Sequence, residues 1–296
     1  MQSNSEERDP TKAWARVRRR TAASRHTLHH YLWKAALNNN NNNIHASILP
    51  HLPKKACVAG IGPGTCIWLL DVARELGPDG DLDWLQNDVS QAPHITSLPA
   101  NVHKPLNEYK YKWDISRPAP WFLLGRYDYV HVRLLVPVVQ NRDPRVVLRN
   151  LLSLLKPGGY LQWDEQDVVH MRVNKPSTDP WLPTPALDGL CEYLRAVGPD
   201  DGIIARLEKS LAEVGFSDVK TEFLGHPPPE LASAFTELHL LAIEEAVADA
   251  VVERNRVQKD TDKCYMAIEK AYDEVMAGAS ICIPRVVFVA RRPLFS

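Results

Sequence analysis

The stretch Val58–Trp68, VAGIGPGTCIW, runs from a short apolar segment through two closely spaced glycines into an apolar run with helical spacing. A strand that ends in glycines and leads into a helix leaves backbone N–H groups free, and glycine lets a ligand approach them closely. The dinucleotide pattern G-x-G-x-x-G would need glycine where Ile67 stands, and the Gly-Lys-Ser/Thr of a P-loop is missing. What remains is Gly62-x-Gly64-x-Cys66, which predicts a ligand-binding turn but is a weak signal by itself.

Short β-branched runs alternate with helical patterns on both sides of this turn. We expect strands at 56–61, 82–85, 127–133, 160–163, 218–224 and 285–291, and helices at 67–76, 144–155 and 203–214. This alternation is typical of an α/β protein with a mostly parallel sheet and helices on both faces. Ligands of such sheets bind beyond the carboxyl ends of the strands, where the strand order switches.

The chain divides into four parts by composition and pattern. Residues 1–43 form an N-terminal helical segment, beginning at Asp9-Pro10 and running toward Leu37, followed by the asparagine tract Asn38–Asn43, which we expect to be a flexible loop. Residues 44–228 form the core, 229–280 a helical insertion, and 281–296 the last strand and the C-terminus. An insertion of that size is expected to cover a site as a lid or to build a homodimer interface.

Composition limits the classes of function. The chain has 296 residues, 45% of them hydrophobic, which suits one large α/β domain with additions. A formal net charge of −1 gives no reason to expect nucleic acid or a membrane as partner. Five cysteines without a CxxC pair indicate reduced thiols and neither disulfides nor a zinc site, and the histidines and carboxylates lack metal-ligand spacing. With no membrane-spanning run and no signal peptide, we expect a soluble cytoplasmic protein.

Four arginines, at positions 16, 18, 19 and 20, leave a nuclear location open. Such a cluster is a nuclear address, a phosphate contact, or simply a solvated helix face, and the last interpretation is the more common for so short a run.

Two carboxylates support the interpretation of the turn as a nucleoside site. Asp88, in QNDVS, follows the second expected strand, where a carboxylate can accept both ribose hydroxyls. Asp114 stands where it could accept the adenine amino group. Each has a plainer alternative, since Asp88 would also cap a helix before Ser90 and Asp114 would also be an ordinary loop carboxylate.

Four runs together resemble a known family: CVAGIGPGTCIWLLDVAREL, NDVS, YDYVHVRLL and VLRNLLSLLKPGGYLQWDE. They are similar to the class I S-adenosylmethionine-dependent methyltransferases, and within them to the fungal LaeA-like proteins of secondary metabolism, over roughly residues 27–292. The resemblance implies a Rossmann-like, seven-stranded sheet with an antiparallel last strand, and S-adenosylmethionine as cofactor. It also implies that the glycine loop, with Gly60, Gly62 and Gly64, meets the methionine part, that Asp88 holds the ribose and that Asp114 lies beside the adenine.

The loop departs from the family at two positions. Family members usually carry an acidic residue two positions before the first loop glycine, where it orients the ammonium group of the cofactor, and here Gly60 stands there. The third loop glycine is replaced by Cys66. Losing a carboxylate beside a cation removes a hydrogen bond of about 1.5–3 kcal/mol, or about tenfold to a hundredfold in affinity. We therefore expect weakened cofactor binding.

Methyl transfer from a sulfonium requires alignment of the acceptor atom with the methyl group, and a general base when the acceptor is protonated. Candidate bases near the strand ends are His131, Glu165 and His170, and candidate substrate contacts are Arg133, Trp163 and Trp181. A histidine within a strand is more often structural than catalytic. Carboxylates at strand ends also cap sheets, and tryptophans mostly fill cores.

Three hypotheses follow. The first is methyl transfer to oxygen or nitrogen of a small-molecule secondary metabolite, supported by the retention of Asp88 and Asp114. The second is a cyclisation, rearrangement or elimination of a biosynthetic intermediate on the same fold, supported by the two departures in the loop. The third is a non-catalytic, LaeA-like regulator, supported by the arginine cluster alone.

Overall fold

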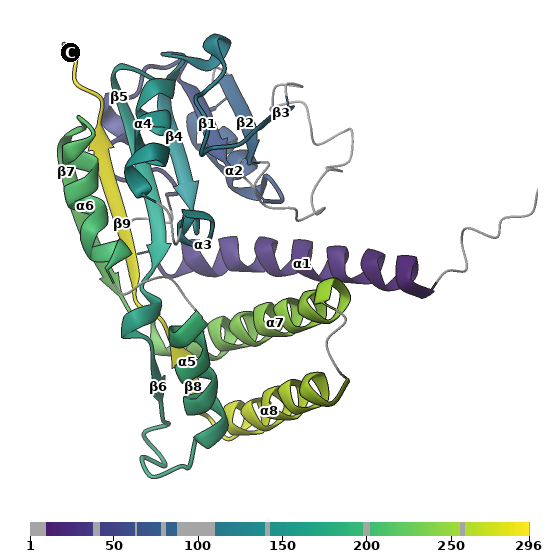
Figure 1. The fold of residues 1–296 in the computed structure, drawn as a ribbon. Helices are drawn as coiled ribbons and strands as arrows, with labels where there is room; N and C mark the ends of the chain where they lie inside the picture. Colours follow the sequence, from purple (N-terminus) through teal and green to yellow (C-terminus); the bar gives the residue numbers. More distant parts are fainter. Residues whose placement is uncertain are drawn as a thin grey trace, which may run out of the picture.

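The fold is that of a computed structural model, which describes residues 10–37, 42–62, 64–77, 81–87, 110–139, 143–197, 202–254 and 258–295 (Figure 1). Its centre is a seven-stranded sheet in the order β3-β2-β1-β4-β5-β9-β7. The strands are β1 (Cys57–Ile61), β2 (Asp81–Asn87), β3 (Lys110–Trp113), β4 (Tyr127–Arg133), β5 (Leu155–Gln166), β7 (Ser217–Gly225) and β9 (Arg285–Arg291). Strand β9 runs antiparallel to both of its neighbours, and the pairs from β3 to β5 are parallel. The order reverses between β1 and β4, which makes the carboxyl ends of these strands the expected place for a ligand.

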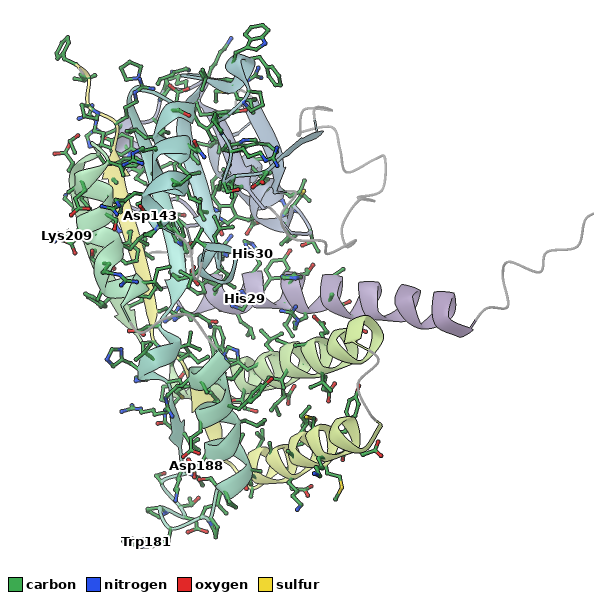
Figure 2. All side chains as sticks on the ribbon, in the orientation of Figure 1. His29, His30, Asp143, Trp181, Asp188 and Lys209 are labelled. Atoms are coloured by element: carbon green, nitrogen blue, oxygen red, sulfur yellow. The ribbon has the colours of Figure 1, made fainter. Side chains whose placement is uncertain are left out.

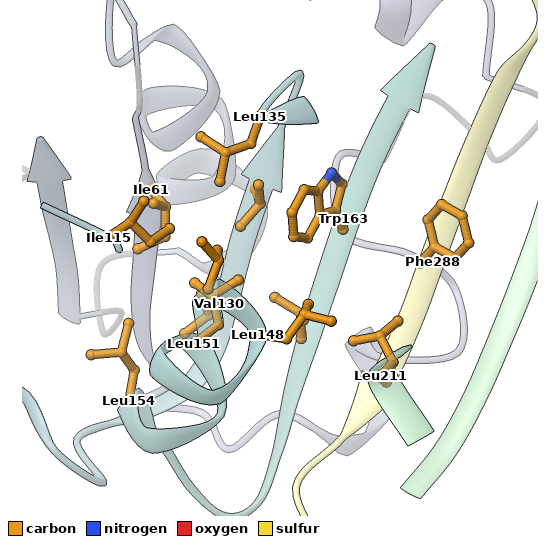
Figure 3. Packing of buried hydrophobic residues seen from close by; sticks show 14 of the residues in the cluster. Ile61, Ile115, Val130, Leu135, Leu148, Leu151, Leu154, Trp163, Leu211 and Phe288 are labelled. Carbon is orange, nitrogen blue, oxygen red and sulfur yellow. The ribbon is translucent and has the colours of Figure 1, made fainter. Parts of the chain in front are cut away.

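Helices cover both faces of the sheet because strand side chains alternate between them. Val58, Tyr129 and Val287 pack with helix α2 (Ile67–Leu76) on one face. The intervening side chains, among them Val130 and Phe288, pack with α4 (Pro144–Leu154) and α6 (Ile203–Glu213) on the other (Figure 3). The face covered by α2 is also the one that carries polar side chains near the strand ends.

The KPGG motif near the start of β5 has a steric reason. Gly158 has φ 81°, a left-handed conformation that favours glycine. At Gly159 an added Cβ would lie 2.9 Å from the carbonyl oxygen of Tyr127. The motif therefore lets β5 pass close to the backbone of β4, and it fixes the register of the two strands.

A second group of elements lies beyond the carboxyl ends of the parallel strands. Helix α1 (Pro10–Ala35) crosses there, and α7 (Pro229–Arg254) and α8 (Gln258–Met276) follow below it in Figure 1. Helix α5 (Pro185–Val197) and the two-stranded sheet of β6 (Arg172–Asn174) and β8 (Ser280–Cys282) complete this group. It has its own apolar core from α5, α7, α8 and β8, and α1 packs on α7 through Leu32 and Phe235. Short elements are α3 (Val136–Val139) and the 3-10 turns at Leu49–His51, Trp121–Leu123 and Val168–His170.

The expected strands and helices are confirmed, and those at 67–76, 127–133 and 285–291 have the predicted bounds. The antiparallel last strand is confirmed as well. Strand β3, helix α5 and the small sheet were not predicted. The last residue of the asparagine tract, which was expected to be a flexible loop, packs against the fold: Asn43 is 1% exposed, and its backbone N–H and its side-chain amide both donate to Glu75.

Candidate functional site

The glycine loop leaves β1 at the reversal of strand order and enters α2. Gly62 and Gly64 have φ 59° and 55°, so both occupy the left-handed region that favours glycine. Among the described residues, no atom lies within 4 Å of a Cβ added at Gly64, so the loop backbone borders open space within this part of the chain. The first residues of α2 receive no side-chain cap from Cys66. This cradle fits an anionic or polar ligand group, such as the carboxylate of a bound amino acid.

The structure gives a physical account of both departures in the loop. A Cβ at Gly60 would lie 3.2 Å from the side chain of Leu69, which is fully buried. A side chain at this position would therefore require Leu69 to shift by a few tenths of an ångström. Cys66 adopts φ 58° as the residue before α2, a left-handed conformation, and it is also fully buried. The backbone thus keeps the glycine-like shape at position 66 at a cost in strain.

Of the two carboxylates predicted to hold the nucleoside, the structure describes one. Asp88 lies outside the described residues, so its role stays a prediction. Asp114 directly follows β3, and its Oδ1 accepts hydrogen bonds from the backbone N–H and the hydroxyl of Ser116, at 2.9 and 2.6 Å. Its Oδ2 lies 3.4 Å from Nε of Arg117. The carboxylate is therefore fixed beside the strand end, and its contact with an adenine stays a prediction.

A polar layer covers the α2 side of the sheet near the carboxyl ends of β4 and β5. Nε2 of His131 lies 2.9 Å from Oδ2 of Asp164, and Nη2 of Arg133 donates to the same oxygen at 2.7 Å. The indole of Trp68 stacks on the imidazole of His131 with ring centroids 3.8 Å apart. All of these side chains are buried or nearly so.

Burial and charge set the protonation of this layer. Burial lowers the pKa of His131 below its ordinary value, and the nearby Asp164 carboxylate offsets only part of this effect. Burial alone would raise the pKa of Asp164, but Arg133, His131 and a hydrogen bond from Gln162 outweigh it and hold that pKa well below its usual range. At neutral pH the layer therefore holds a neutral imidazole beside a carboxylate that is paired with Arg133.

Helix α1 covers this layer and joins it to the loop. The hydroxyl of Thr27 donates to that of Thr65 in the loop at 3.2 Å, and the guanidinium of Arg133 lies 4.9 Å from the ring centroid of Trp33. Nε2 of His30 lies 3.0 Å from Oδ2 of Asp71 on α2 (His30 is labelled in Figure 2). Hydrogen bonds from Lys34, His30 and Asn43 outweigh burial and lower the pKa of Asp71 to about 2.

Glu165 lies on the opposite face of the sheet. Its Oε2 accepts hydrogen bonds from the backbone N–H of Val136 at 3.0 Å and from the indole of Trp163 at 3.1 Å. Burial raises the pKa of this carboxyl to about 7. Trp163 itself is fully buried in the core shared with α4. Glu165 and Trp163 are thus separated from His131 by the sheet.

The remaining predicted residues lie at the surface. His170 pairs with Asp167 at 2.6 Å and is exposed. Trp181 is 89% exposed and lies at the far end of the second group of elements (Figure 2). The structure therefore brings His131 and Arg133 together but places Glu165, His170, Trp163 and Trp181 elsewhere. Their proposed roles stay predictions.

The sequence placed Asp164, with Glu165, at a strand end but did not predict its pairing with His131 and Arg133, and it gave no sign of His30, Trp33 and Arg285. The alternation of side chains along YDYVHVR already puts His131 and Arg133 on one face. Their partner Asp164 depends on the register of β4 and β5, and the contribution of α1 depends on tertiary packing. These could not be predicted from local pattern.

No family model matches the chain. Among curated proteins, methyltransferase grgD of Penicillium sp is 38% identical over 131 residues, which cover 42% of this chain and 42% of that protein. N-methyltransferase verN of Clonostachys rogersoniana is 29% identical over 157 residues, or 53% of this chain and 50% of that protein. Secondary metabolism regulator LAE1 of Gibberella fujikuroi is 27% identical over 173 residues, or 56% of this chain and 51% of that protein.

The sheet order with its antiparallel β9 is the Rossmann-like α/β arrangement that the resemblance predicts. The chain is related in sequence to fungal proteins named methyltransferases and to LaeA-type regulators of secondary metabolism, which confirms the predicted resemblance. The matches span about half the length of these curated relatives, or less.

None of the described helices is both long and apolar enough to cross a membrane. Within the described ranges, no three histidine, cysteine or carboxylate side chains come together as a metal site.

Proposed function

We propose that the protein binds S-adenosylmethionine and transfers its methyl group to oxygen or nitrogen of a small-molecule secondary metabolite. The observation that carries this proposal is the loop with Gly62 and Gly64 at positive φ, which borders open space at the reversal of strand order. The names of the curated relatives support methyl transfer as the reaction. When bound, S-adenosylmethionine supplies an electrophilic methyl group on a sulfonium.

The residues of the chain would have three tasks. The loop and the start of α2 would hold the amino-acid end of the cofactor, and Asp88 and Asp114 its nucleoside. Helix α1, fixed to the loop by Thr27, would exclude water from the strand ends. For a hydroxyl acceptor, His131 is the candidate base. It is neutral because burial lowers its pKa, and Asp164 would stabilise the imidazolium that forms when it takes the proton.

A second function is favoured by one observation. Leu69 fills the space where a side chain at position 60 would lie, so the site lacks the acidic group that usually orients the cofactor. This change fits an enzyme that cyclises, rearranges or eliminates a biosynthetic intermediate, because such chemistry needs a shaped and dry site more than a tightly held methyl donor.

Calorimetric titration with S-adenosylmethionine and its demethylated product tests the proposal. The wild-type chain should bind both in the micromolar range, Asp88→Asn should lose about tenfold or more in affinity, and Glu192→Gln, at an exposed position on α5, should bind like the wild type. Absence of binding at millimolar cofactor would reject methyl transfer. Binding without transfer to any of a panel of phenols, carboxylic acids and amines, followed by mass spectrometry, would favour the second function.

A further inference from the structure

Arg285 is a buried cation at the carboxyl-end side of the parallel strands. It begins β9 opposite Gln166 of β5. Val287 and Val289, the next residues of the same parity, pack on the α2 side of the sheet, so Arg285 points to the side that α1 covers. Its guanidinium lies 5.6 Å from the ring centroid of Trp33 on α1, and the residue is only 2% exposed.

This cation has no anionic partner among the described residues. Nε and Nη1 of Arg285 are buried without a hydrogen-bond partner in the described part of the chain. Its pKa falls to about 10 through burial and through the charge of Arg133. Arg133 differs, since its guanidinium donates to Asp164 at 2.7 and 3.0 Å. Both guanidiniums lie near the same indole, and among the described residues a carboxylate pairs with that of Arg133 but not with that of Arg285.

Two neighbours of Arg285, Trp33 by ring contact and Gln166 by strand register, also carry unsatisfied donors. Within the described ranges, the indole Nε1 of Trp33 and the amide Nε2 of Gln166 are also buried without a partner. An indole N–H and a guanidinium can only donate, so the group missing from this place is an acceptor. A buried cation and two buried donors left unpaired destabilise the fold unless an anionic acceptor meets them. Gln166 is partly exposed as a residue, although its Nε2 is buried.

The position separates Arg285 from the proposed cofactor site. Strands β4 and β5 lie between β1 and β9, which puts β9 about 14 Å from the strand that carries the glycine loop. A cofactor on that loop, with its nucleoside beside β2 and β3, extends away from Arg285. A second molecule that approaches the cofactor from the other side would therefore meet β4, β5 and β9.

We infer that Arg285, with the N–H groups of Trp33 and Gln166, binds a carboxylate of the acceptor substrate. The acceptor is then an organic acid, held under α1 by its charge. That the bound carboxylate belongs to a methyl acceptor rests on the proposed function. The anion site itself depends on the buried donors and stands or falls separately.

Benzoate serves as the probe, with benzamide as its uncharged counterpart and inorganic phosphate as a second anion. Each is titrated into the full chain by thermal unfolding and by calorimetry, in the wild type, in Arg285→Met and in Arg149→Met. Arg149 is an exposed arginine on α4, on the other face of the sheet. Binding of S-adenosylmethionine is measured in parallel in all three proteins.

We expect benzoate to raise the melting temperature of the wild type and of Arg149→Met, and to leave that of Arg285→Met unchanged. Without ligand, Arg285→Met should melt at or above the wild-type temperature, since it removes an unpaired buried cation, whereas a purely structural role predicts a lower one. Equal responses of all three proteins to benzoate, or to benzamide, would overturn the inference, and a response to phosphate alone would overturn the carboxylate. Benzoate binding without cofactor binding would reject the proposed function and keep the anion site.

Discussion

Replacing Glu165 by glutamine should remove a pH dependence of stability that the burial of this carboxyl creates. Glu165 is 2% exposed, and burial raises its pKa from 4.5 to about 7 although hydrogen bonds from Trp163 and the backbone oppose the change. Between these pH values the folded chain keeps a proton that the unfolded chain has released. Because the folded state binds more protons in this window, the free energy of unfolding falls as the pH rises.

The size of the effect follows from the two pKa values. The difference between 4.5 and about 7, at about 1.4 kcal/mol for each pH unit, corresponds to about 3 kcal/mol. This contribution is complete below pH 4.5 and is lost as the pH rises through 7. Buried histidines act in the opposite direction, because burial lowers the pKa of His30 and His239 to about 4, so that each adds stability as the pH rises toward 6.5. The wild type and Glu165→Gln both contain these histidines, so the difference between their pH dependences of stability reports Glu165 alone.

Urea unfolding followed by far-UV circular dichroism at pH 5 and pH 8 measures the effect. From the lower to the higher pH, the stability of Glu165→Gln relative to the wild type should rise by roughly 2–3 kcal/mol. The cost of the mismatched amide is the same at both pH values and cancels. The exposed Glu192→Gln is the matched control and should follow the wild type. If all three proteins show the same pH dependence, the carboxyl is ionised in the fold and the reasoning fails.

Three further substitutions test the site and the sheet. Gly60→Asp should lower stability by roughly 1–3 kcal/mol in urea unfolding, because its Cβ would lie 3.2 Å from Leu69. In a Leu69→Ala background the same change should raise cofactor affinity about tenfold or more, measured by calorimetry. An unchanged affinity would show that an acidic side chain at position 60 does not contact the cofactor. Gly159→Ala should cost roughly 1–3 kcal/mol, since a Cβ there would lie 2.9 Å from a carbonyl oxygen of β4, and an unchanged urea midpoint would contradict this. His131→Asn should keep cofactor binding and slow transfer to a hydroxyl about 10²-fold or more; equal rates would exclude it as the base.

The elements that the sequence predicts well are those whose side chains alternate or repeat with a clear period. YDYVHVR and RVVFVAR are buried along nearly their whole length, and the two strands have the predicted bounds. Strand β3, KYKW, does alternate between polar and apolar residues, but it has only four residues and lies at the edge of the sheet, so the signal is too short to stand out. Helix α5 packs on α8, and strand β8 of the small sheet packs on α7, so their apolar residues belong to a second core that cannot be recognised from local sequence.

The candidate site, too, could be predicted from the sequence only in part. The glycine loop was predictable because its chemistry is local, and its positive φ values follow from Gly62 and Gly64. The polar layer was only half predictable. Its strand residues share a face by parity, but the cover comes from α1, about a hundred residues earlier in the chain than Arg133. Whether a buried charge has a partner depends on such distant contacts, and local sequence carries no record of them.

The charges of the loop and of the polar layer together determine which ligands are favoured. Under α1, Asp71 lies against Lys34 and Asp164 against Arg133, so these cations are compensated within the chain. Arg285 is not compensated by any described carboxylate, and the position usually held by an acidic residue in the loop is Gly60. A cationic cofactor on the loop would therefore find no carboxylate at position 60, while a buried cation without a described carboxylate partner lies farther along the same side of the sheet. An acidic acceptor would supply the missing negative charge, so cofactor and acceptor should each favour the binding of the other, and the weak loop would matter less once the acceptor is present.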